Sequence, residues 1–193
     1  TFIESDTALF NKYAISEDVD AVFFDANGDT FPDLFVLAGG NEIPANELAL
    51  LDRLYLNDGT GHFSREQNPM SVVYENKSCV LVADIDNDGD QDIFVGNMTS
   101  PVKYGTPTTS YLFINDGKAH FTKAGADIIP LDLLGMVTAA SFTDIDNDGW
   151  KDLYVCATTN PDSTLRRNML FVNQGLDASG EPVFKELAAQ YKI

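Results

Sequence analysis

Basic side chains are scarce in this sequence. Its 193 residues hold 12 Lys and Arg against 30 Asp and Glu, which gives a formal net charge of −18. Proteins that bind nucleic acid neutralise phosphates with clustered basic side chains, so this composition excludes nucleic acid as a partner. The sequence also has no apolar run of about 20 residues, the length that crosses a bilayer as a helix. We therefore expect no membrane insertion.

Side chains that often carry catalysis are equally few, with two His and two Cys. His62 and His120 each stand directly before a Phe at the same place in two copies of a repeat, which indicates a structural position. Cys79 and Cys156 lie in apolar runs and are expected to be buried thiols. Because no Ser-His-Asp or Cys-His arrangement is recognisable, we expect no enzymatic activity.

What the sequence does contain is a threefold internal repeat, the feature to seek first in a new chain. Three landmarks recur in each copy, in one order. An aspartate opens an acidic loop at Asp25, Asp84 and Asp144, spaced by 59 and 60 residues. An asparagine starts an Asn-Asp-Gly or Asn-Gln-Gly turn at Asn57, Asn115 and Asn173, and a phenylalanine follows at Phe63, Phe121 and Phe184.

Each copy contains four short segments rich in β-branched and aromatic residues, separated by turn-forming residues, which indicates four antiparallel strands. The fold class predicted is all-β, with three β-propeller blades over residues 18–76, 77–136 and 137–193. Residues 1–17 begin like the end of the third copy and are predicted to be an outer strand of a preceding blade. Since propellers close with about four to eight blades, we expect part of a larger propeller, or self-association across the open blade faces.

The acidic loops have the composition of metal sites. Counted from the leading aspartate, positions 1, 3, 5 and 9 carry oxygen side chains, and the backbone carbonyl at position 7 would add a ligand. Such a density of carboxylates is repulsive unless a cation neutralises it, and hard oxygen ligands favour Ca²⁺. The predicted ligands are Asp25, Asn27, Asp29, Phe31 and Asp33; Asp84, Asp86, Asp88, Asp90 and Asp92; Asp144, Asp146, Asp148, Trp150 and Asp152.

An EF-hand is the main alternative, because its loop begins the same way. It requires a bidentate Glu at position 12 and flanking helices, whereas position 12 here is Val36, Val95 and Val155 within β-rich flanks. The first loop departs from the other two, with Asn27 at position 3 and Thr30 in place of glycine at position 6. We therefore expect two to three Ca²⁺ ions.

These loops and the DLFV, DIFV and DLYV strands after them resemble the FG-GAP/VCBS repeat family, which includes the propeller of integrin α subunits. The LYLNDGTGHF and LFINDGKAHF segments are also similar to the bacterial ASPIC/UnbV-type form of the repeat. The resemblance implies a β-propeller with calcium in its loops and a role in adhesion, ligand recognition or surface architecture. It also implies an extracellular, cell-surface or periplasmic location.

The long loops at the opposite ends of the strands are the expected surface for a protein or glycan ligand, because long loops on a rigid scaffold often carry function. Tyr104, Arg166 and Arg167 are the contact residues that we predict there. A carbohydrate-binding, lectin-like propeller, or the non-catalytic part of a polysaccharide lyase or hydrolase, is the alternative function.

Overall fold

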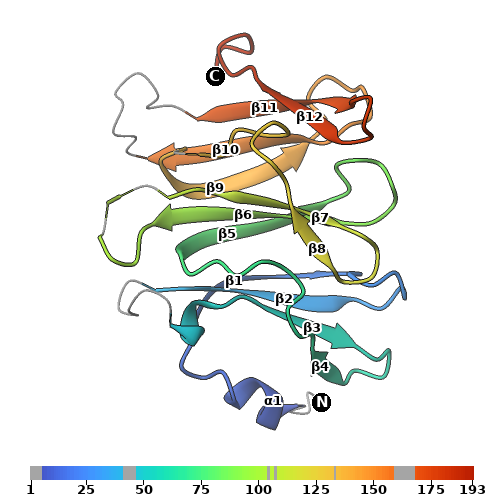
Figure 1. Cartoon of the computed structure of the whole chain (residues 1–193), viewed down its shortest axis with the longest axis vertical. Coiled ribbons are helices and arrows are strands. Elements are labelled where there is room, and N and C mark those ends of the chain that lie inside the picture. The colour runs from blue at the N-terminus through green and yellow to red at the C-terminus, as the bar shows by residue number, and fades with distance from the viewer. Residues whose placement is uncertain (1–5, 41–46, 104, 107, 133, 159–167) are drawn as a thin grey trace.

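Three four-stranded antiparallel sheets make up the protein, as predicted for three blades (Figure 1). The computed structural model describes residues 6–40, 47–103, 105–106, 108–132, 134–158 and 168–193. The sheets are stacked along the long axis of the molecule, with the N-terminus and the C-terminus at opposite ends of the stack. We call them blades 1, 2 and 3 in chain order.

The strands follow the chain within each blade. Blade 1 contains β1 (Glu17–Phe24), β2 (Asp33–Gly39), β3 (Arg53–Asn57) and β4 (Phe63–Arg65). Blade 2 contains β5 (Asn76–Ala83), β6 (Asp92–Thr99), β7 (Tyr111–Asn115) and β8 (Phe121–Lys123). Blade 3 contains β9 (Met136–Thr143), β10 (Asp152–Thr158), β11 (Met169–Leu176) and β12 (Pro182–Glu186). A short 3₁₀ helix, η1 (Leu48–Leu50), precedes β3.

Burial along the strands follows from the stacking. All but one of the residues of β6 are buried, because the middle blade is covered on both faces. In β9, at an edge of the last sheet, only Val137 is fully buried and four of the eight residues are exposed. Accordingly β6 contains the apolar segment 93–96, whereas β9 contains Thr138, Ser141 and Thr143.

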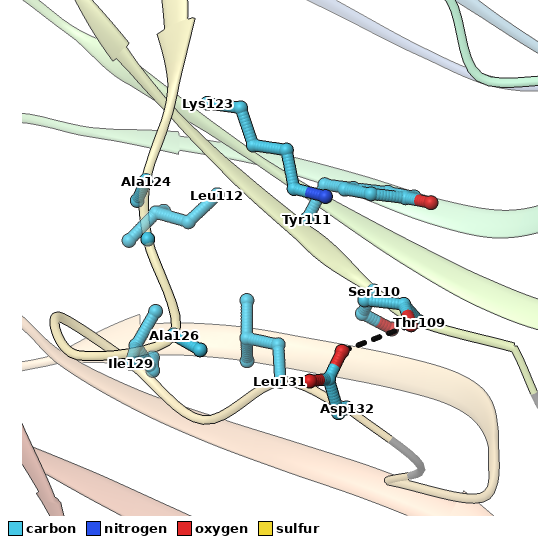
Figure 2. Close-up of a pocket in the computed structure, with 11 residues that line it drawn as sticks. Thr109, Ser110, Tyr111, Leu112, Lys123, Ala124, Ala126, Ile129, Leu131 and Asp132 are labelled. Carbon is cyan, nitrogen blue, oxygen red and sulfur yellow. Dashed lines mark hydrogen bonds between the residues drawn. The ribbon is translucent and has the colours of Figure 1, made fainter.

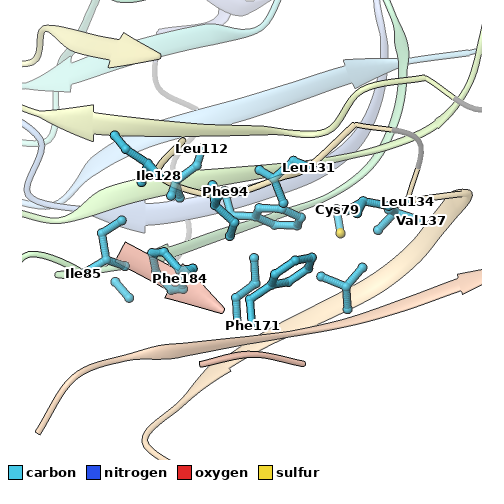
Figure 3. Packing of buried hydrophobic residues seen from close by; sticks show 14 residues of the cluster. Cys79, Ile85, Phe94, Leu112, Ile128, Leu131, Leu134, Val137, Phe171 and Phe184 are labelled. Carbon is cyan, nitrogen blue, oxygen red and sulfur yellow. The ribbon is translucent and has the colours of Figure 1, made fainter. Parts of the chain in front are cut away.

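Two apolar layers hold the stack together. Between blades 1 and 2, Phe24 and Phe35 share a buried cluster with Phe113. Between blades 2 and 3, Phe94 of β6 lies with Phe171 and other buried side chains (Figure 3). Full burial of one such side chain contributes about 1.5–3 kcal/mol, so these layers are the main source of stability. Both cysteines are free thiols.

The asparagine landmark links neighbouring blades. Asn115 of blade 2 donates from Nδ2 to the carbonyl of Ala26 in blade 1, at 3.1 Å. Asn173 of blade 3 makes the same contact with the carbonyl of Ile85 in blade 2, at 2.8 Å. Asn57 lies in the first of the three blades, and its Nδ2 donates within that blade to the carbonyl of Pro32.

The turns after the asparagines differ from the predicted tight hairpins. In blades 1 and 2 they are five-residue loops, closed by a hydrogen bond from Asp58 N to His62 O at 3.0 Å and its equivalent in blade 2. In blade 3 the predicted turn lies inside β11, at an irregularity in the pairing with β12. The inserted residues move the loop to Asp177, whose N–H bonds the carbonyl of Glu181.

The prediction of an outer strand over residues 1–17 is wrong for residues 6–16. They form helix α1 (Thr7–Asn11) and a turn. The Phe10 ring packs on Tyr55, with ring centroids 5.1 Å apart, and Asp6 Oδ2 accepts the N–H of Phe63. Phe10 in the helix and Tyr13 in the turn after it both pack on Tyr55 of β3, so contacts with blade 1 stabilise this segment.

The inter-blade amide contact predicts unequal effects of equivalent substitutions. Asn173→Ala leaves the Ile85 carbonyl unpaired in a buried site, which should lower the free energy of unfolding by about 1–3 kcal/mol. Asn57→Ala loses the same contacts within its blade but no inter-blade bond, so its loss should be clearly smaller. Urea titration of both variants measures the difference, and equal losses would contradict the assigned role.

Candidate metal centres

The acidic loops connect the first two strands of each blade and share one backbone shape. Loop position 4 is left-handed in all three, at Gly28 (φ 77°), Asn87 (φ 59°) and Asn147 (φ 60°). Position 6 is left-handed as well, at Thr30 (φ 73°), Gly89 (φ 101°) and Gly149 (φ 95°). Asn and Gly are the residues that adopt this region most readily, so the sequence differences of the first loop do not change its path.

Backbone N–H groups hold the carboxylate at position 1. In the third loop, Asp144 accepts the N–H of Asp148 and that of Gly149, both at 3.0 Å. In the second loop, Asp84 Oδ2 accepts the N–H of Gly89 at 3.1 Å. Its other oxygen, Oδ1, is buried and has no hydrogen-bond partner. An unpaired, buried carboxylate oxygen is costly, which marks this position as one that a cation would satisfy.

The carboxylate at position 9 is the most buried acid of each loop. Asp92 accepts the N–H of Ile85 through Oδ2 and the N–H of Asn115 through Oδ1, both at 2.9 Å. Asp33 and Asp152 make the equivalent pair of bonds at 2.8–3.0 Å. The relative exposure of the three is 0–1%. Position 9 therefore connects the start of the loop to the third strand.

Carboxylate oxygens converge in two of the three loops. Asp84, Asp86 and Asp88 have oxygens within 4.8 Å of one another in blade 2. In blade 3 the group is Asp144, Asp146 and Asp152, and Asp148 lies beside it in the same loop. Oxygen ligands in this number, without imidazole or thiolate in the groups, suit a hard cation such as Ca²⁺.

The loop of blade 1 differs in its charges. Asn27 replaces an aspartate at position 3, and its Nδ2 donates to Asp29 Oδ2 at 2.9 Å. Asp25 is occupied by three backbone N–H groups of the loop, those of residues 28 to 30. Among the described residues, these side chains do not form a convergent group of three acids. In blade 1 the Asn27 amide thus satisfies a carboxylate oxygen of Asp29 that a cation would satisfy in the other loops.

Mutual repulsion is visible in the protonation equilibria of the second loop. Burial, followed by the charges of Asp88 and Asp84, raises the pKa of Asp86 to about 6. Burial raises the pKa of Asp92 to about 7, against the lowering effect of its two backbone hydrogen bonds. The carboxylates are therefore ionised at a cost in this loop, a cost that a bound divalent cation would offset.

Comparison with known families agrees with this arrangement. The family model of the FG-GAP-like repeat matches residues 25–95 and 102–155, about two thirds of the chain. The chain belongs to the FG-GAP-like repeat family. The matched segments cover all three acidic loops completely and end within β10, and the family folds as β-propeller blades. No curated protein matches the chain.

Position 7 of each FG-GAP-like loop has a packing role that sequence reasoning missed. The Phe31, Asp90 and Trp150 side chains lie against the glycine that follows the asparagine landmark by two residues in each blade, Gly59, Gly117 and Gly175. A Cβ on Gly59 would come within 2.5 Å of the Phe31 ring, and one on Gly117 within 2.3 Å of Asp90. Positive φ therefore favours glycine at these positions, and at Gly59 the Phe31 ring also occupies the space that a Cβ would need.

The predicted ligand contacts Tyr104, Arg166 and Arg167 lie outside the described residues. The loop after β6, to which Tyr104 belongs, and the loop after β8 contribute residues to a cavity in blade 2 that is taken up below. Within the described part of the chain, no helix has the length and apolar character needed to cross a membrane.

Thr30, the strained residue of the FG-GAP-like loop in blade 1, is a position where substitution should stabilise the protein. Thr30 is β-branched at φ 73°, so Thr30→Gly should raise the free energy of unfolding by about 1 kcal/mol. Thr60, in an exposed turn without positive φ, is the control, and Thr60→Gly should give no gain. Chemical denaturation of both variants tests this. A destabilised Thr30→Gly protein would show that the threonine is not strained.

Proposed function

We propose that the chain is a calcium-stabilised segment of a β-propeller in an extracellular, cell-surface or periplasmic protein. Its role would be ligand recognition or adhesion, without catalysis of its own. Membership of the FG-GAP-like repeat family supports the propeller. The convergent acids of blades 2 and 3 support the metal.

One observation carries the calcium proposal. Asp84 Oδ1 is buried and unpaired at the centre of the group formed with Asp86 and Asp88. The N–H groups of Asp88, Gly89 and Asp90 donate to other oxygens, which leaves Asp84 Oδ1 available to a cation. All the candidate ligands are oxygens. Ca²⁺ accepts a variable number of oxygen ligands, whereas Mg²⁺ requires a strict octahedron, so this loop suits Ca²⁺ better.

The proposed ion would be structural. The loop that would hold it lies between β5 and β6, and its position-2 carbonyl accepts the amide of Asn173 from the next blade. A cation that fixes the loop therefore also fixes an inter-blade contact. Extracellular calcium modules bind at roughly 10⁻⁴–10⁻³ M, a range that is filled outside the cell, and this supports the proposed location.

The outer face of blade 1 supports a larger propeller. Phe23 of β1 is 61% exposed, whereas its counterparts Val82 and Phe142 pack against the preceding blade. Ile145, at loop position 2 of blade 3, is only partly buried, although the equivalent Ala26 and Ile85 are fully buried. Phe23 and Ile145 thus lie on the two end faces of the stack, at positions that a neighbouring blade covers in the interior, and additional blades would cover them in the same way.

Calcium should stabilise the protein measurably. With calcium at about ten times Kd for two sites, the melting temperature should rise by roughly 5–10 °C relative to excess EDTA. Asp86→Asn and Asp146→Asn should each remove about half of this rise, since each removes a carboxylate from one group. The control Asp116→Asn changes an exposed acid outside the loops and should retain the full rise.

A calcium-independent melting temperature in the wild-type protein would rule out the structural ion. Equal responses of Asp86→Asn and Asp116→Asn would place the ion elsewhere, because Asp116 belongs to the turn after β7.

The single tryptophan allows the sites to be told apart. Trp150 occupies loop position 7 in blade 3, directly beside the proposed ligands. Terbium bound there should luminesce when the indole is excited. Asp146→Asn should abolish this emission, whereas Asp86→Asn, in another blade, should preserve it. Emission that survives Asp146→Asn would exclude terbium, and by analogy calcium, from the third loop.

A further inference from the structure

A cavity lies at the end of blade 2 that is remote from its acidic loop. Asn115, at the far end of β7, contacts the acidic loop, while Tyr111, at the near end, lines the cavity. The cavity has a volume of about 320 Å³, which falls in the range of ~300–1,000 Å³ typical of ligand sites. Its walls come from both loops that the sequence analysis associates with ligand binding, those after β6 and after β8.

Part of the cavity wall is apolar and closely packed. Leu112, Ile129 and Leu131 contribute to it (Figure 2), and each is at most 5% exposed because it also belongs to the apolar layer between blades 2 and 3. Backbone hydrogen bonds hold the surrounding segments in place, from Ala124 N to Leu112 O at 2.8 Å and from Ser110 N to Leu131 O. A ligand with a hydrophobic face would find a preformed surface here.

A lysine lies above this surface. Lys123 Nζ is 4.2 Å from the centroid of the Tyr111 ring, a cation–π contact that positions the ammonium at the cavity (Figure 2). Within the described chain, the ammonium has no carboxylate partner and no hydrogen-bond acceptor. Lys123 is exposed, so its ammonium is accessible to a ligand that enters the cavity.

A hydrogen-bonded acid lies across the cavity from the lysine. Asp132 Oδ1 accepts the hydroxyl of Thr109 at 3.0 Å, so the side chain has a fixed orientation at the rim (Figure 2). Its remaining acceptor capacity is directed toward hydroxyl or amine donors. The cavity therefore combines one positive charge, one hydrogen-bond acceptor and an apolar wall.

We infer that this cavity binds a monocarboxylated sugar of the uronic acid class. This inference rests on the proposed ligand-recognition role. The carboxylate of such a sugar pairs with Lys123, a ring hydroxyl donates to Asp132, and the C–H face of the ring packs on Leu112, Ile129 and Leu131. The site is separate from the acidic loops, because none of their carboxylates lines the cavity.

The charges argue against other anions. Lys123 supplies one positive charge, and Asp132 would repel a phosphate carrying nearly two negative charges. A neutral sugar would leave the ammonium unpaired. A singly charged carboxylate with neighbouring hydroxyls satisfies both side chains.

The test uses D-galacturonate, its uncharged methyl ester and D-galactose as probes on the full chain with calcium. Ligand-observed NMR titration should show galacturonate binding at least tenfold tighter than either uncharged compound. Lys123→Met should weaken galacturonate binding at least tenfold, while Lys118→Met, an exposed lysine in the turn of the same blade, should leave it unchanged. Tyr111→Phe should preserve binding and Tyr111→Leu should weaken it, since the ring holds the ammonium.

Three results would overturn the inference: no preference for the acid over its ester, equal behaviour of Lys123→Met and Lys118→Met, or no binding of any probe. A glycan array distinguishes this failure from that of the proposed function. Binding to neutral glycans alone would refute the uronic acid class but retain ligand recognition, and the calcium-dependent melting curve tests the structural role independently.

Discussion

The buried carboxylate at position 9 of each acidic loop is the contact on which the blade architecture depends. In blade 2, Asp92 binds the N–H of Ile85 at the loop start and the N–H of Asn115 at the end of β7. Hydrogen bonds to a charged acceptor contribute about 1.5–3 kcal/mol each. The Asp92 side chain thus joins its own segment to two others, which lie 7 and 23 residues away in sequence.

The residue that Asp92 orients also connects the blades. The N–H of Ile85 donates to Asp92 within the blade, and the carbonyl of Ile85 accepts a hydrogen bond from Asn173 of the next blade. The same peptide segment is therefore fixed from both sides, and the apolar Ile85 side chain is buried in the layer between the blades. Since burial raises the pKa of Asp92, the ionised form is held at a cost. A cation among the neighbouring acids would reduce that cost, and this links metal binding to the stacking of blades.

Much of this arrangement could be predicted from the sequence, because its signals are local. The alternate spacing of Asp84, Asp86 and Asp88 predicts their convergence, since a loop with left-handed residues brings such side chains to one point. The contacts of Asn115 and Asn173 could not be predicted, since they join residues 88 or 89 positions apart. Helix α1 was missed for a similar reason: its stability comes from the rings of blade 1 rather than from five residues of helix propensity.

Strand β7 relates the two ends of blade 2 to each other. Asn115, at its last residue, belongs to the contacts around the acidic loop, and Tyr111, at its first, holds the lysine of the cavity. The strand is paired on both sides, with β6 and β8, so it cannot shift without breaking both ladders. Order imposed by the acidic loop therefore extends along β7 to the cavity wall, whereas the loops that complete the cavity are free to differ in sequence. A scaffold of this kind keeps its repeated end constant and can carry a different ligand site on each blade.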